Sequence, residues 1–338
     1  MKLPFEFNTR LIFRLVLPGA ILAAAALPFI QAVLRGAGIW IKAEFVYPAA
    51  IVLCGWLIVA CDMRIYMAFE GRRYWPRRLR TWAVDRERQR LQRLAGILDE
   101  PNVDRRRFLE AGVEYSHYPL DEKGEAYVAH PTRVGNLIEA FETYPKIKYG
   151  LDSVFFWYRL WVVLDKDLRE EIAGAQSVAD STIYVSFALY VSGLLMWIYS
   201  ACRALAEAPW LARYVQANPP LPYLPSAETL LVLGLVCLLA GFLIYRVSLT
   251  AHAQFGELFK AVFDQFRSRL SFEDIVKEAG RIGDQPGAVL RSQREKNRIV
   301  WRYLRWHMVR DEAAGKNLTV KQWEERLAAR GEAAGKEG

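Results

Sequence analysis

Four long apolar runs divide the sequence, and more polar stretches separate them. A helix of about 20 apolar residues is needed to cross the roughly 30 Å hydrocarbon core of a bilayer. The pattern therefore predicts an all-α, polytopic membrane protein with four transmembrane helices. We expect the spans at about residues 11–34, 46–69, 183–204 and 228–248.

The second run differs from the others because charged residues interrupt it near its end. Asp62 and Arg64 follow its most apolar part, and apolar residues resume as far as Phe69. We interpret the whole stretch as one tilted helix whose charges lie at the inner membrane interface. A cleaved signal peptide is the alternative for the first run, but that run exceeds the roughly 7 to 15 residues of a signal-peptide core.

Lysine and arginine indicate the orientation of the spans, because they are enriched in cytoplasmic segments. Ten of them lie between Arg64 and Arg93, whereas the connections after the first and third spans carry two each. We therefore expect a multi-pass protein of the bacterial inner membrane with both termini in the cytoplasm. Anionic lipids would meet charges at the inner interface, for which the candidates are Asp62, Arg64, Arg72, Arg73, Arg77 and Arg78.

The topology predicts five parts of the chain. They are an N-terminal segment with the first transmembrane hairpin (1–75), a cytoplasmic helical domain (76–180), a second hairpin (181–250), C-terminal cytoplasmic helices (251–330) and a disordered tail (331–338). The second, third and fourth spans should extend into the cytoplasm, since helical patterns continue beyond them. Beyond the fourth span, an apolar stripe that includes Phe255, Phe259 and Phe263 recurs at helical spacing.

Capping residues and prolines place the shorter helices. We expect helices over about 104–114, from Thr132 to Tyr144 with a stop at Pro145, and over 152–163, which is unusually aromatic. An extended piece is expected at 125–129. A capping box at Ser271, a helix over about 289–309 and a last helix from Thr319 complete the prediction.

An arginine-rich helix should follow the second span, beyond Pro76. Leu79 and Trp82 recur at helical spacing among its arginines. One interpretation is an interfacial helix that contacts anionic lipid. The other is a basic helix packed on the rest of the cytoplasmic domain. Trp75 and Trp82 favour lipid contact slightly, because tryptophan is enriched at membrane interfaces.

Composition and motifs exclude several classes of function. The net charge is +8, but the basic residues concentrate beside the apolar runs, so we expect no nucleic-acid partner. The four cysteines lie in or beside apolar runs, without histidines at ligand spacing, so we expect no disulfide or metal site. Phosphate-binding glycine loops and known hydrolase motifs are missing, which predicts no cofactor.

Three blocks of the sequence resemble a family of bacterial four-span membrane proteins of uncharacterised activity. The blocks are HPTRVGNLIEAFETYP (130–145), KYGLDSVFFWYRLW (148–161) and FGELFKAVFDQFR (255–267). The resemblance implies four spans with helical cytoplasmic parts, and it implies nothing about a reaction. The order of spans and cytoplasmic parts is also similar to that of bestrophin-type anion channels, although none of their motifs is found.

The most suggestive group of polar residues lies within the first two blocks. These residues are of the types that bind an anionic ligand, and equally of the types that cap helices and form structural salt bridges. We favour the structural interpretation over the ligand site. The members of this predicted polar network are Arg133, Asn136, Glu139, Asp152 and Arg159.

Three functions remain open, and an enzyme is the least favoured. The leading hypothesis is a homo-oligomeric, channel-like assembly with a cytoplasmic vestibule. The alternative is a membrane-anchored scaffold or sensor that binds a cytoplasmic protein partner through its helices. The third is a lipid-modifying enzyme with a polar pocket around Asp62, His252 and Glu257. Charged residues are missing from the middle of every span, which disfavours coupled transport.

Overall fold

The structure, a computed structural model, describes residues 12–121, 123–207, 225–270, 272, 292–306, 308–311, 316–319, 321–322 and 325. In this part of the chain, the elements are helical except for two short strands, so the predicted all-α class is confirmed. Several predictions lie outside the described residues. They are the first residue of the first span, the capping box at Ser271, the start of the helix expected from 289 and the tail 331–338.

The chain folds into two compact units. Unit 1 comprises Met1–Gln89, His130–Gly135 and Glu170–Phe255, and unit 2 comprises Arg90–Ala129, Asn136–Arg169 and Gly256–Gly338. Four of the five boundaries fall inside helices, namely α5 (Arg77–Asp99), α7 (Arg133–Tyr149), α9 (Lys166–Glu207) and α11 (Ala227–Phe266), and the fifth lies between Ala129 and His130, outside any helix.

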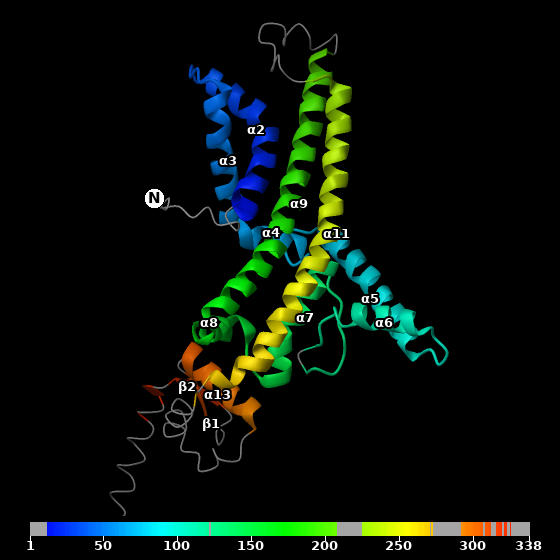
Figure 1. Cartoon of the computed structure of the whole chain (residues 1–338), viewed down its shortest axis with the longest axis vertical. Helices are drawn as coiled ribbons and strands as arrows, with labels where there is room; N and C mark the ends of the chain where they lie inside the picture. The colour runs from blue at the N-terminus through cyan, green and yellow to red at the C-terminus, as the bar shows by residue number, and fades with distance from the viewer. Residues whose placement is uncertain are drawn as a thin grey trace, which may run out of the picture. The chain divides into compact units, whose positions relative to one another are not determined.

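The first hairpin of unit 1 packs two apolar helices closely. A π-helical turn, η1 (Ile12–Val16), continues into α2 (Leu17–Gly36), which lies beside α3 (Ala43–Ala60) (Figure 1). Glycines allow the approach, since a Cβ added to Gly19 would lie only 2.8 Å from the backbone nitrogen of Gly55. Small residues serve this purpose in many membrane helix pairs.

The second apolar run forms two helices, not the single tilted helix predicted over 46–69. After α3 ends, α4 (Asp62–Phe69) follows at an angle of 63°. Cys61, between them, has φ −94° and ψ 8° and so leaves the helical conformation. The single-helix prediction is wrong because Asp62 begins a new helix, whose N-terminal dipole favours a carboxylate there.

The second hairpin contains helices much longer than a bilayer requires. α9 has 42 residues and α11 has 40, which corresponds to about 60 Å each at 1.5 Å per residue. Within unit 1 they run side by side (Figure 1), and Ser186 of α9 donates a 2.9 Å hydrogen bond to the carbonyl of Gly241 in α11. Both apolar runs therefore continue without a break into the more polar helical stretches that adjoin them.

Three helices, not four, qualify as membrane spans by their own length and composition. They lie at Ile12–Gly36, Lys166–Leu205 and Ala227–Arg269. α3 and α4 provide a fourth only if the bent pair is taken as one span. The described part of the chain thus contains three candidate spans, or up to four.

Aromatic side chains form much of the core of unit 2. The ring of Phe259 in α11 lies with its centroid 5.3 Å from that of Phe141 in α7. It lies 4.6 Å from the ring of Trp157 in α8 (Ser153–Val163). Phe263, one turn further along α11, is fully buried. The predicted apolar stripe beyond the fourth apolar run therefore packs against the predicted aromatic helix.

Two helices of unit 2 begin where their capping residues predict. The carboxylate of Asp104 accepts a 3.0 Å hydrogen bond from the backbone nitrogen of Arg106 at the start of α6 (Arg105–Tyr115). The carboxylate of Asp152 likewise accepts a 2.9 Å hydrogen bond from the backbone nitrogen of Phe155 in α8. Each bond satisfies an N–H group that has no partner within its own helix.

The predicted stop at Pro145 is wrong, because α7 passes through this residue and ends at Tyr149. A proline within a helix costs about 3 kcal/mol, because it removes one hydrogen bond and its ring clashes with the preceding turn. Contacts made by the turn before the proline offset that cost. Phe141 packs on Phe259, and the hydroxyl of Tyr144 donates a 2.9 Å hydrogen bond to Asp264.

The C-terminal part contains strands that the sequence analysis does not predict. α13 (Gln293–Trp306) is followed by β1 (Met308–Asp311), which pairs antiparallel with β2 (Lys316–Thr319). The predicted helix through Val309 therefore ends too late. Thr319 ends β2, and its hydroxyl accepts a 3.2 Å hydrogen bond from the backbone nitrogen of Gln322, where the described residues turn helical as expected near Thr319.

Candidate functional site

Unit 1 contains a buried cluster of ionisable side chains. They come from η1, α4, α9 and α11, segments that lie far apart in the sequence. Burial of such groups costs free energy unless each has a partner, so their contacts determine what the cluster can do. The cluster consists of Arg14 from η1, Asp62 and Tyr66 from α4, Asp180 and Tyr184 from α9, and His252 from α11, which contacts the backbone carbonyl of Ser248.

Arg14 and Asp180 form the ion pair of the cluster. The guanidinium Nη2 of Arg14 lies 2.9 Å from the carboxylate Oδ2 of Asp180, and the two side chains are 36% and 9% exposed. The same Nη2 donates a 3.5 Å hydrogen bond to the hydroxyl of Tyr184. A carboxylate this deeply buried needs such a partner, because the loss of its hydration costs several kcal/mol.

Tyr184 joins the ion pair to a second carboxylate. Its hydroxyl donates a 2.7 Å hydrogen bond to Oδ1 of Asp62, and its side chain is fully buried. Asp62 is the first residue of α4, directly after the bend. This hydrogen bond therefore holds the start of α4 to α9.

Tyr66 connects Asp180 to His252. Its hydroxyl oxygen lies 2.5 Å from Oδ1 of Asp180 and 3.2 Å from Nε2 of His252. The other ring nitrogen, Nδ1, lies 2.7 Å from the carbonyl oxygen of Ser248. A carbonyl oxygen only accepts hydrogen bonds, so Nδ1 of His252 carries a hydrogen atom.

These contacts allow two placements of the same protons. In the first, Tyr66 donates to an ionised Asp180, and the Nε2–H of a charged His252 donates to Tyr66. In the second, a protonated Asp180 donates to Tyr66, which donates to Nε2 of a neutral His252. Burial favours the second placement, whereas the nearby Arg14 guanidinium favours the first. The cluster can thus pass a proton between Asp180 and His252 without moving a heavier atom.

The predicted inner-interface charges take different positions in unit 1. Asp62 belongs to the cluster, and Arg72 forms a short ion pair with Glu70 in the turn after α4. The remaining arginines face solvent on the surface of the unit, and they are Arg64, Arg73, Arg77 and Arg78.

The predicted polar network is divided between the two units. Arg133 belongs to unit 1, and the other four residues belong to unit 2. Asp152 caps α8, and Arg159 donates a 2.8 Å hydrogen bond to the carbonyl of Phe155 one turn earlier. Asn136 is buried and Glu139 is half-buried in α7. The contacts of Asp152 and Arg159 are local to α8, which is what a structural role requires.

The residues named for an enzyme pocket are also divided. Asp62 and His252 lie in the cluster, and both ring nitrogens of His252 have an oxygen within hydrogen-bonding distance. Glu257 belongs to unit 2, where its carboxylate lies 2.8 Å from the Lys260 ammonium. Among the described residues, no group of three or more histidine, cysteine or acidic side chains is arranged to hold a metal ion.

Sequence reasoning does not single out Arg14, Tyr66, Asp180 or Tyr184, because their partners are distant in the chain. Tyr66 and His252, for example, are 186 residues apart. One signal was available in the topology. Arg14, Asp180 and His252 all lie at the ends of apolar runs that the orientation rule assigns to the same membrane face.

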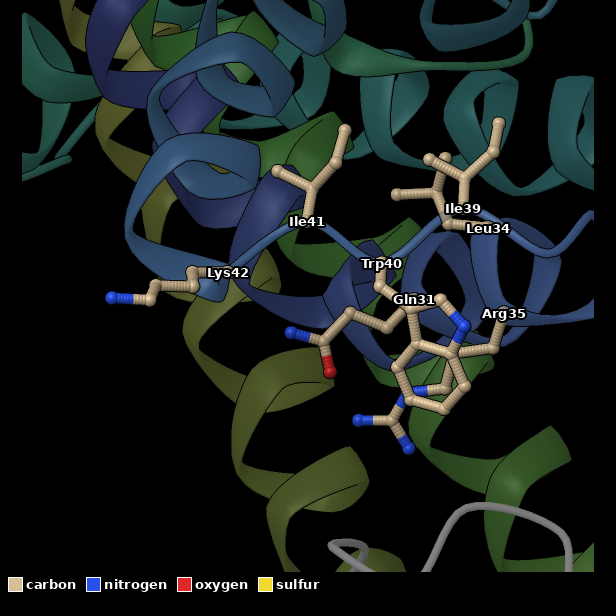
Figure 2. Close-up of a pocket in the computed structure, with 7 residues that line it drawn as sticks. All are labelled: Gln31, Leu34, Arg35, Ile39, Trp40, Ile41 and Lys42. Carbon is tan, nitrogen blue, oxygen red and sulfur yellow. The ribbon is translucent and has the colours of Figure 1, made fainter.

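A hollow of about 490 Å³ lies at the turn between α2 and α3. Figure 2 shows Gln31, Arg35 and Trp40 on one side of the connecting chain, with Ile39 and Ile41 on the other. Trp40 is 82% exposed, so the hollow is an open surface feature. The cluster is the stronger candidate site, because its ionisable groups are buried or half-buried and hydrogen-bonded to one another.

No protein family, curated protein or solved structure matches this chain. The resemblance of three sequence blocks to a four-span family therefore stays a prediction. Any function has to be argued from the residues of this chain and their geometry.

Proposed function

We propose that this chain is a four-span protein of the bacterial inner membrane and that copies of it assemble into a channel-like structure. The observation that carries the proposal is the cluster around Arg14, Asp180 and His252. Ionisable residues buried among membrane helices are costly and usually belong to ion pathways. In this chain they come from all four apolar segments and meet at one place. A change in their contacts there would control the passage of ions.

The proposed topology counts α3 as a full crossing. Its 18 residues correspond to about 27 Å, close to the roughly 30 Å of hydrocarbon. α4 then lies at the inner interface, where exposed Arg64 reaches the polar head groups and Asp62 stays in the cluster. The excess of arginine after α4 supports cytoplasmic placement of this side and of both termini.

Exposed apolar side chains support a location in the membrane. They follow much of α11, where they would otherwise form a large unfavourable surface in water. The same surface is available for lipid and for contacts between copies of the chain. The exposed residues on α11 include Leu231, Val232, Leu235, Val236, Leu239, Phe242 and Leu243.

Ion flux into liposomes tests this proposal. The purified chain should pass at least one of K⁺, Cl⁻ or H⁺, and native mass spectrometry should detect an oligomer. Asp180→Asn should change the flux, because it removes the charge that holds Arg14. Glu44→Gln is the matched control, since Glu44 is 64% exposed and pairs weakly with Lys42. A folded oligomer that passes none of these ions would contradict the proposal.

α8 favours a second candidate function, a membrane-anchored scaffold or sensor. Val154, Tyr158 and Val162 recur every fourth residue and are 65%, 75% and 76% exposed. They form an apolar stripe of the kind that docks a partner helix. Two results together would favour the scaffold over the channel. They are a monomer that passes no ion, and a soluble partner whose binding is lost in Tyr158→Glu.

A further inference from the structure

The first turns of α5, residues 77–89 in unit 1, expose arginine and large apolar side chains on one face. Leu79, Trp82 and Arg86 recur at helical spacing and so share a face. Leu79 is 45% exposed and Trp82 is 58% exposed. The guanidinium carbon of Arg86 lies 5.7 Å from the centroid of the Trp82 ring. This face, which we call the Trp82 face, has both apolar and cationic groups directed outward.

The exposed charge around the Trp82 face is strongly positive. Of the two acidic residues on these turns, Glu87 is buried and Asp85 is 3.0 Å from the guanidinium of Arg88. No exposed carboxylate on these turns is left to balance the other arginines. The exposed arginines are Arg77, Arg78, Arg80, Arg86 and Arg88.

The side of the same turns next to the Trp82 face is covered. Ala83 and Glu87, one turn apart, are 5% and 8% exposed. The helix therefore packs along the side that adjoins the Trp82 face, while the Trp82 face itself stays exposed. Trp75 is not part of this face, because its indole nitrogen donates a 2.8 Å hydrogen bond to the carbonyl of Ala68.

The chain keeps these turns close to α4. Only the seven residues 70–76 separate the end of α4 from the start of α5. Even fully extended, this connection spans at most about 28 Å. Helix α5 therefore begins close to the place where the second apolar run leaves the proposed membrane.

We propose that the Trp82 face docks on the cytoplasmic surface of the same bilayer and binds anionic lipid. Trp82 and Leu79 enter the head-group region, where tryptophan is preferred, and Arg78 and Arg86 contact lipid phosphates. Each arginine near an anionic surface shifts the docked-to-free ratio by about fivefold. This docking rests on the proposed membrane crossing of α3, but it does not depend on ion conduction.

Quenching of tryptophan fluorescence by brominated lipid tests the docking in the full chain. The protein is placed in nanodiscs of zwitterionic phosphatidylcholine alone, or with added anionic phosphatidylglycerol. The contribution of Trp82 is the difference in quenching between the wild type and the Trp82→Phe variant. Trp56 of α3 is the matched control, because it is equally exposed at 58% and lies within a proposed span.

We expect a Trp82 contribution in anionic discs that shrinks in zwitterionic discs and at high salt. Arg78→Gln with Arg86→Gln should lower the docked-to-free ratio about 25-fold while Trp82 is retained. The Trp56 contribution should be the same in both discs. A Trp82 contribution that is zero, or equal in both discs, overturns the docking. Either result would point to another acidic partner for the Trp82 face. Absence of Trp56 quenching would overturn the crossing of α3 and the docking together.

Discussion

The hydroxyl of Tyr184 donates a 2.7 Å hydrogen bond to Asp62 across 122 residues of sequence. Tyr184→Phe keeps the ring but removes this donor from a carboxylate. We expect a loss of about 1 to 3 kcal/mol in the free energy of unfolding, measured on the solubilised protein. Tyr158→Phe on the surface of α8 should change it by less than about 0.5 kcal/mol. Equal effects of the two substitutions would contradict a role for the Asp62 contact.

The Arg14–Asp180 pair should stabilise unit 1 more than an exposed pair of the same charges does. Loss of one partner of a buried pair costs about 3 to 5 kcal/mol, and partial exposure of Arg14 reduces this to about 2 to 3 kcal/mol. Asp180→Ala should show this loss, whereas Glu44→Ala, next to exposed Lys42, should cost about 0 to 1 kcal/mol. A double-mutant cycle with Arg14→Ala isolates the coupling. A coupling near zero would rule out the pair as a stabilising contact.

The glycines at the contact between α2 and α3 provide a test of the close packing of these two helices. A Cβ on Gly55 would lie 2.9 Å from Cγ of Leu15, so Gly55→Ala should destabilise the hairpin by about 1 to 3 kcal/mol. Gly174, within α9, has no atom within 4 Å of an added Cβ. Gly174→Ala should therefore stabilise the protein by up to about 1 kcal/mol through helix propensity. Thermal unfolding of the two variants should shift in opposite directions.

The hydrogen-bonded series Asp180–Tyr66–His252 predicts a carboxyl group whose proton depends on the tyrosine. Infrared difference spectra between high and low pH should contain a protonated carboxyl band that disappears in Asp180→Asn. Tyr66→Phe should shift that band, because it removes the hydroxyl that lies 2.5 Å from the carboxylate. If the spectra of wild type and Asp180→Asn are identical, Asp180 does not share a proton within the cluster.

Patterns among residues close together in the sequence predict the helix caps and the long helices of this fold. Asp104 and Asp152 cap helices because their carboxylates reach N–H groups two or three residues away. Apolar periodicity likewise predicts α9 and α11 as long helices. The bend at Cys61 is missed because apolar residues resume after it, and average hydropathy does not register a local change of direction.

The cluster could be predicted only in part. Asp62 is named from the sequence as an inner-interface charge and, together with His252, as part of an enzyme pocket. The roles of Asp180 and Tyr66 depend on contacts between segments that are distant in the sequence, and no local pattern encodes such contacts. Pro145 illustrates the same limit, since tertiary packing around α7 outweighs the local preference of proline to end a helix.

His117 should make the stability of unit 2 depend on pH. Burial, and then the charge of Lys260, lower the pKa of His117 below its ordinary value of 6.5, while Glu257 and Glu114 oppose this in part. The unfolded chain therefore takes up a proton at a higher pH than the folded chain does. The stabilising contribution is complete above pH 6.5 and is lost as the pH falls below that value toward the lowered pKa of the folded state.

Hydrogen exchange in unit 2 at pH 7.5 and pH 5, corrected for intrinsic exchange rates, measures this effect. We expect wild type to lose protection at the lower pH. His117→Gln should lose less, because glutamine keeps polar atoms at this position and takes up no proton. Lys260→Gln should also weaken the dependence, since it removes the positive charge that opposes protonation of the imidazole. Equal losses in wild type and His117→Gln would assign the pH dependence to other groups.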